Sequence, residues 1–248
     1  MEPHEQSWVR LPLDGAFNVR ELGGYPVANG DQTKFHRFLR ADSLGRLTAW
    51  DAQFLYDYGV RAVVDLRDTS EVEDFPDQVI AADVAYANTP LLGFNIADAR
   101  AVEQMVFETD FSMDMVYRTI LENYEAIRAC FRFIADAPPG CVLFHCSVGK
   151  DRTGILAMLL LSLAGVDKWD IVADYVQTRP NLMRDEIFAL DWHDASNESF
   201  RASMESSADV IEHAYDLVEL EHGGVESYLL ECGVPDEVVA SVRRRLLL

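Results

Sequence analysis

The sequence of 248 residues has few cysteines and no long hydrophobic run. Its four cysteines, Cys130, Cys141, Cys146 and Cys232, form no Cys-x-x-Cys pair, which argues against a disulfide framework and a structural zinc site. The longest apolar run, 155–166, is shorter than the roughly 20 residues that span a bilayer. No signal-peptide pattern opens the chain. We therefore expect a soluble, cytoplasmic protein without integral membrane association; secretion by a route that uses no signal peptide remains an alternative.

Positive charge is also scarce. The chain has 42 acidic residues against 21 basic ones, which gives a formal net charge of −21. Because clustered Lys and Arg hold a phosphate backbone, this charge disfavours nucleic acid as a partner. It also mildly favours a phosphoprotein over an anionic lipid surface as substrate. Hydrophobic residues make up 49% of the chain, which is ample for one core, so we expect a single domain, 1–248.

The hydrophobic patterns alternate between the periods of strands and helices. Helices are predicted at 49–58, 111–135 and 153–164, and buried strands at 60–66, 83–88 and 141–144. After Gly165 every patterned segment is predicted to be helical. This order indicates an α/β fold with a central, mostly parallel sheet flanked by helices, and a helical C-terminal half. Residues 184–207 include the most polar stretch, so they are a candidate lid or flexible insertion.

One loop carries the chemistry. Between the strand at 141–144 and the helix at 153–164 lies His145-Cys-Ser-Val-Gly-Lys-Asp-Arg-Thr-Gly154. A loop that enters a helix N-terminus directs several backbone N–H groups at one point and binds an anion of phosphate size. The N–H groups and the positive end of the helix also stabilise the thiolate form of Cys146, which lies at the base of this loop. Arg152 can grip two phosphate oxygens, which places the sulfur for attack on phosphorus.

Three other interpretations explain the loop less well. A buried core thiol beside a surface cation would leave the Cys-x5-Arg spacing, which is typical of cysteine-dependent phosphatases, without a reason. A nucleotide-binding loop needs Gly-x4-Gly-Lys-Ser/Thr, whereas Asp151 follows Lys150 here and residue 144 is not glycine. A zinc site would have adjacent ligands at His145 and Cys146 and no second pair.

The ten-residue motif resembles that of the atypical bacterial tyrosine and lipid phosphatases. The resemblance covers nearly the whole chain: it extends to 17–25, 38–42, 65–67, 172–175 and 224–229. It implies the cysteine-phosphatase fold. It also implies a reaction through a phosphocysteine on Cys146, which water hydrolyses, with no metal or other cofactor.

The resemblance also implies roles for the neighbours of Cys146. Arg152 would bind the phosphoryl oxygens, His145 would orient the loop, and Thr153 would donate a hydrogen bond to the sulfur. Asp151 is the candidate general acid, because the Trp-Pro-Asp tripeptide of classical tyrosine phosphatases is absent. Alternatives for that role are Asp98, Asp110 and Asp114. The remaining residues expected to bind phosphate are Ser147, Val148, Gly149 and Lys150.

The substrate stays open at this point. Phosphotyrosine is the first expectation, with phosphoserine, phosphothreonine and phosphoinositides as further substrates. Lys150 adds a second cation to the loop, so a phosphoinositide or inositol-phosphate phosphatase is an alternative, as is a non-catalytic adaptor. Arg20 and Arg67 either contact substrate or form buried ion pairs with Glu21, Asp42 or Asp65, and Asp65 is expected to be structural. The oligomeric state is not predicted.

Overall fold

A computed structural model describes residues 10–28, 30–92, 112–194 and 204–248. The strands are β1 (Arg20–Glu21), β2 (Phe38–Ala41), β3 (Val60–Asp65), β4 (Ala85–Asn88) and β5 (Cys141–His145). The helices are α1 (Ala49–Tyr58), α2 (Thr69–Asp74), α4 (Met113–Glu122), α5 (Tyr124–Asp136), α6 (Asp151–Ala164), α7 (Lys168–Val176), α8 (Thr178–Leu182), α9 (Glu186–His193), α11 (Ala208–His222), α12 (Val225–Glu231) and α13 (Asp236–Leu247).

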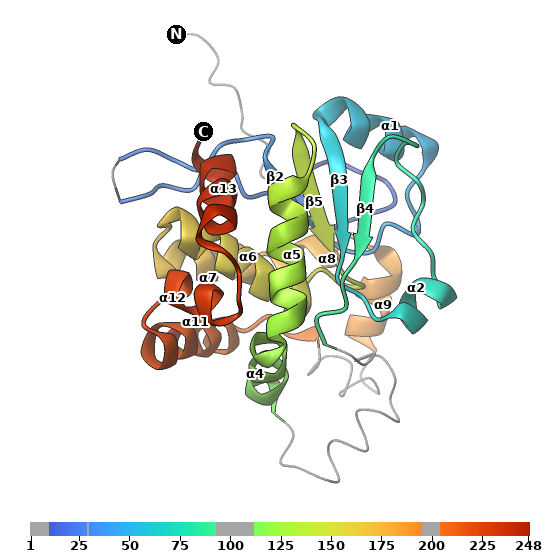
Figure 1. The fold of residues 1–248 in the computed structure, drawn as a ribbon. Coiled ribbons are helices and arrows are strands. Elements are labelled where there is room, and N and C mark those ends of the chain that lie inside the picture. The colour runs from blue at the N-terminus through green and yellow to red at the C-terminus, as the bar shows by residue number, and fades with distance from the viewer. Residues whose placement is uncertain (1–9, 29, 93–111, 195–203) are drawn as a thin grey trace, which may run out of the picture.

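The strands form one mixed sheet in the order β1-β2-β5-β3-β4 (Figure 1). Strand β5 is central and runs parallel to β2 on one side and to β3 on the other, and β4 extends the sheet beside β3, also in parallel. Of the strands in the described ranges, β1 alone is antiparallel to its neighbour. Because the carboxyl ends of parallel strands meet at one edge, the segments that follow β2, β3 and β5 come together there.

The side chains of β5 point alternately to the two faces of the sheet, and each face has its own hydrophobic cluster. Val142 and Phe144 join the larger cluster, which includes residues of α4 to α7 and α11 to α13. Cys141 and Leu143 point into a smaller cluster that the N-terminal segment and α1 complete. In Figure 1, α5 lies across the sheet face that carries the larger cluster, and it packs against α13. Both faces are therefore covered, as parallel sheets require.

This arrangement confirms the expected α/β class, with a mostly parallel sheet flanked by helices and a helical C-terminal half. Local signals also hold: Thr48 caps α1 and Gly59 ends it in a left-handed conformation. No described helix combines the length and the apolar character that crossing a membrane requires.

Two boundaries differ from expectation. The single helix predicted over 111–135 is wrong, because the described part is divided at Asn123 into α4 and α5. The Asn123 side chain accepts a hydrogen bond from Ala126 N and donates to Leu91 O at 3.1 Å, so it caps the second helix and anchors the break. Helix α6 begins at Asp151, two residues earlier than the predicted 153, so Asp151 and Arg152 belong to its first turn. Within the candidate lid 184–207, residues 195–203 lie outside the described ranges.

Candidate active site

The loop after β5 wraps around the sulfur of Cys146. The side chain is only 2% exposed, and its Sγ accepts a hydrogen bond of 3.3 Å from the backbone N–H of Gly149. Lys150, the N-cap residue of α6, makes no side-chain cap hydrogen bond, so its side chain leaves the first N–H groups of that helix to other partners. The loop that contacts the thiol thus leads directly into the start of α6, which is the arrangement that the anion-binding interpretation requires.

Side chains from the N-terminal segment and from β2 hold the far side of the loop. Asn18 Nδ2 donates to the carbonyls of Val148 and Gly149 at 3.2 and 3.1 Å, and Arg40 Nη2 donates to Gly149 O at 2.7 Å. Asp42, at the end of β2, accepts two consecutive backbone N–H groups, including that of Asn18 at 3.0 Å. Asp42, directly after β2, therefore fixes Asn18, and Asn18 in turn holds the loop.

Backbone groups at the same sheet edge hold the other loop carbonyls. Ser43 N donates to Ser147 O at 3.1 Å, and Leu66 N donates to His145 O at 2.9 Å. Because these carbonyls are bonded to groups outside the loop, they do not compete for its backbone N–H groups. Loops whose N–H groups converge on one point are the ones that bind phosphate.

The loop requires glycine at position 149. Its φ is +72°, in the left-handed region, and a Cβ there would lie 2.5 Å from the carbonyl oxygen of Ala41. A side chain would therefore push the loop away from β2.

Arg152 is held by a residue that the sequence reasoning did not single out. Both of its terminal nitrogens contact the carboxylate of Glu71, one of them at 3.0 Å, and Ser147 Oγ also donates to Glu71. Burial alone would raise the pKa of Glu71, but the hydrogen bond and the charge of Arg152 hold that pKa below its usual range. Glu71 follows the carboxyl end of β3, so it fixes the arginine beside the loop.

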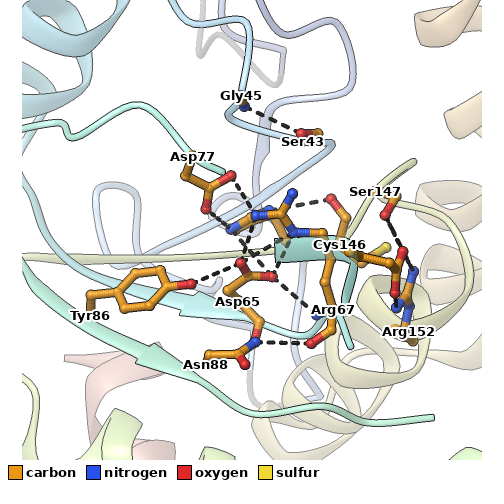
Figure 2. A network of polar contacts seen from close by, with 12 residues as sticks. Ser43, Gly45, Asp65, Arg67, Asp77, Tyr86, Asn88, Cys146, Ser147 and Arg152 are labelled. Atoms are coloured by element: carbon orange, nitrogen blue, oxygen red, sulfur yellow. Dashed lines mark hydrogen bonds and ion pairs between the residues drawn. The ribbon is translucent and has the colours of Figure 1, made fainter. Parts of the chain in front are cut away.

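Beneath the loop, His145 contacts a carboxylate network. Its Nδ1 donates to Cys146 O at 3.2 Å, and its Nε2 lies 2.9 Å from Asp77 Oδ2. Figure 2 shows Arg67 between Asp65 and Asp77, and its Nη2 contacts their carboxylates at 2.7 and 2.8 Å. The buried ion pair expected for Arg67 and Asp65 is thus present. Asp65, Asp77 and His145 lie close enough to hold a metal ion, but the Arg67 guanidinium already supplies the cation between the two carboxylates.

Arg20 also forms a buried ion pair, but not with an expected partner. Instead of Glu21, Asp42 or Asp65 it contacts Asp174 on α7, with Nε 2.8 Å from Oδ1. Arg40 contacts the other oxygen of the same carboxylate. Burial alone would raise the pKa of Asp174, but the two arginines hold it below its usual range. Arg20 therefore belongs to a buried network that reaches the loop through Arg40 and Gly149 O.

Lys150 and Asp151 lie together at the start of α6. Lys150 is 1% exposed, and its Nζ is 3.3 Å from Asp151 Oδ1 and 3.2 Å from Glu205 O. Tyr117 OH donates to Asp151 Oδ1 at 2.8 Å. The Lys150 side chain is therefore buried at the start of α6 and not exposed on the surface.

For the other candidate residues, the structure either shows no contact of the expected kind or does not describe the residue. Thr153 is buried and its Oγ1 has no hydrogen-bond partner among the described residues, so the predicted bond to Cys146 is not made. Asp114 lies 3.2 Å from His213 with a half-exposed side chain, and no contact places it at the loop. Asp98 and Asp110 lie outside the described ranges.

The residues missed from sequence are distant from the loop along the chain: they lie before β1, in β2, after β3, or on the helices α4 and α7 that pack on α6. They are Asn18, Arg40, Glu71, Asp77, Tyr117 and Asp174. Asp68 and Glu71 form a capping box for α2 directly after β3, and that spacing was a readable signal. The predicted parallel sheet would have brought this turn to the edge where the loop lies.

A buried thiol thus lies at the loop before α6, with an arginine fixed close by through Glu71. A family model described as the tyrosine phosphatase family matches residues 11–248. The chain belongs to this family and is a phosphatase.

Two relatives agree with this assignment by sequence. A tyrosine-protein phosphatase of Nostoc commune is 31% identical over 228 residues, which cover 84% of this chain and 74% of that protein. The triple specificity protein phosphatase PtpB of Mycobacterium tuberculosis is 29% identical over 198 residues, covering 68% of this chain and 69% of PtpB. A crystal structure of P. aeruginosa TpbA, a cysteine-to-serine variant in complex with pTyr, covers 81% of this chain and 98% of its own, with 17% identity and a TM-score of 0.42.

Proposed function

We propose that the protein hydrolyses phosphotyrosine through a phosphocysteine intermediate, without a metal ion. In the first step the Cys146 thiolate attacks phosphorus, the bond from phosphorus to the ester oxygen breaks, and Asp151 gives its proton to that leaving oxygen. In the second step water attacks the phosphocysteine and passes one proton to Asp151. The bond from sulfur to phosphorus then breaks and releases inorganic phosphate and the Cys146 thiolate.

The observation that carries this proposal is the placement of Cys146 at the base of the loop with Arg152 fixed beside it by Glu71. The guanidinium and the loop N–H groups would stabilise the charge that develops on the phosphoryl oxygens, which is the part a metal ion plays in other phosphatases. Thr153, whose buried hydroxyl is not yet engaged, would donate to the sulfur as it leaves in the second step.

A phosphoinositide is the second candidate substrate. Lys150 favours it, because its ammonium group is buried within the loop beside Asp151 and adds a cation that a second phosphate of an inositol ring would contact. The name of the mycobacterial relative, a triple specificity protein phosphatase, also supports a substrate range wider than phosphotyrosine.

The test is phosphate release from a phosphotyrosine peptide, a phosphoserine peptide and a soluble phosphatidylinositol monophosphate, each with a chelator present. Wild type is compared with Cys146→Ser and with Asp151→Asn. We expect turnover that resists the chelator and is lost in Cys146→Ser, with phosphotyrosine as the best substrate.

Other outcomes would change the assignment. A higher kcat/KM for the lipid would make phosphoinositides the substrate class. Turnover that survives in Cys146→Ser would overturn the phosphocysteine mechanism. Tight binding of phosphate esters without any turnover would support the adaptor alternative instead.

A further inference from the structure

Tyr117 links the helix α4 to the candidate general acid. Its ring is 1% exposed, and its hydroxyl donates a hydrogen bond of 2.8 Å to Asp151 Oδ1. The contact joins residues 34 positions apart in the sequence, on two helices that pack against each other. Among the described residues, Lys150 is the other one in polar contact with that oxygen.

A second tyrosine completes the arrangement. The hydroxyl of Tyr175, on α7, lies 2.7 Å from that of Tyr117, and the two rings meet edge to face with centroids 6.4 Å apart. Because Tyr117 has one hydroxyl proton and gives it to Asp151, Tyr175 must be the donor to Tyr117. Burial first, and then the charge of Asp151, raise the pKa of both phenols, so both remain neutral donors.

These contacts treat the two oxygens of Asp151 differently. Oδ1 receives the Tyr117 hydroxyl at 2.8 Å and faces the Lys150 ammonium at 3.3 Å. A carboxylate oxygen that accepts from two donors is the poorer site for a proton, so the acid proton belongs on Oδ2. For Asp151 to protonate a leaving oxygen at the loop, its proton should lie on Oδ2 and its carboxyl group should be held in one rotation.

We propose that Tyr117 is a positioning residue for this phosphatase: it fixes the rotation of the Asp151 carboxyl group and keeps the transferable proton on Oδ2. This inference rests on the proposed role of Asp151 as general acid. Tyr175 contacts the Tyr117 hydroxyl but not Asp151, and its ring packs against α6, since a Cβ at Gly154 would lie 3.0 Å from it. Loss of the Tyr175 hydroxyl leaves the bond to Asp151 in place.

The competing explanation is that the tyrosine pair only packs the junction of α4, α6 and α7. The two explanations differ in how the effect depends on the leaving group. An acid matters most when the departing oxygen is a strong base and least when it is a stable anion. A loss of packing would instead lower the rate for every substrate alike.

The experiment compares kcat/KM for phenyl phosphate and p-nitrophenyl phosphate in wild type, Tyr117→Phe and Tyr175→Phe. The ratio of the two values does not depend on how much of the enzyme is folded. For Tyr117→Phe we expect kcat/KM for phenyl phosphate to fall about tenfold, with a much smaller change for p-nitrophenyl phosphate. Tyr175→Phe is the matched control and should change the ratio by less than about twofold.

A double variant tests whether Tyr117 acts through Asp151. In an Asp151→Asn background, Tyr117→Phe should change the ratio by less than about twofold, because the group it positions is gone. The proposal would be overturned if Tyr117→Phe lowered kcat/KM equally for both substrates. It would also be overturned if Tyr117→Phe changed the ratio as much in the Asp151→Asn background as in wild type. If Asp151→Asn itself shows no dependence on the leaving group, the acid is another residue, and the acid assignment fails together with this inference. If Asp151→Asn shows that dependence and Tyr117→Phe has no effect, this inference alone is wrong.

Discussion

Glu71 and Arg152 form a buried ion pair across 81 residues of sequence. The same carboxylate accepts the backbone N–H of Asp68 at 3.0 Å and so completes the capping box of α2. The start of one helix and the arginine on the first turn of another therefore share one carboxyl group. The orientation of the arginine that would hold phosphate depends on the correct folding of α2.

Replacing Glu71 with glutamine should weaken the site. Glutamine keeps the shape but has no charge and offers one acceptor oxygen, so part of the hold on Arg152 is lost. We expect kcat/KM for an aryl phosphate to fall about tenfold, the equivalent of one charge-assisted hydrogen bond. Initial rates measure this. Glu73→Gln, at an exposed position on α2, is the control, and an equal effect of both changes would show that the ion pair has no special role.

The same pair predicts a dependence of stability on pH. Arg152 holds the pKa of the Glu71 carboxyl below its usual range in the folded state. A depressed carboxyl pKa stabilises the fold above the unfolded-state value of about 4.3, and this stabilisation is lost as pH falls through the lower folded-state value. From about pH 5 to about pH 3, the free energy of unfolding should therefore fall further in wild type than in Glu71→Gln. Urea unfolding at several pH values measures it, and parallel curves would contradict the assignment.

The sequence predicted the parts of the site that are close together along the chain. Strand β5, the loop and α6 follow one another, so their chemistry is visible in ten residues. The partner of Arg20 was not predictable in this way, because Asp174 is 154 residues away and only the packing of α7 brings it close. The break at Asn123 was hidden for a different reason. Apolar residues keep helical spacing across it, and the break shows only in the backbone angles and in the hydrogen bonds of one side chain.

Two glycines with positive φ allow a matched comparison. A Cβ at Gly149 would meet the Ala41 carbonyl at 2.5 Å, whereas a Cβ at Gly165 has nothing within 4 Å. Gly165→Ala should cost about 1 kcal/mol of stability, from its backbone conformation alone, and should leave activity unchanged.

Gly149→Ala carries the additional clash, which moves the loop from β2. It should cost more than about 2 kcal/mol and lower kcat/KM by about a hundredfold, because the phosphate-binding N–H groups are displaced. Urea unfolding and phosphate release measure the two effects. Similar activity in both variants would mean that the loop tolerates this displacement.

Asp174→Asn tests the buried charges beneath the loop. The substitution leaves the Arg20 and Arg40 guanidinium groups buried with no carboxylate between them, and removal of one partner from a buried ion pair costs about 3 to 5 kcal/mol. Arg40 also holds Gly149 O at 2.7 Å, so repulsion from Arg20 should displace the loop and lower activity even in the folded fraction. Asp170→Asn, one turn earlier on the same helix, should cost no more than about 0.5 kcal/mol. If Asp174→Asn loses stability but its folded fraction keeps full activity, the network stabilises the fold without setting the loop geometry.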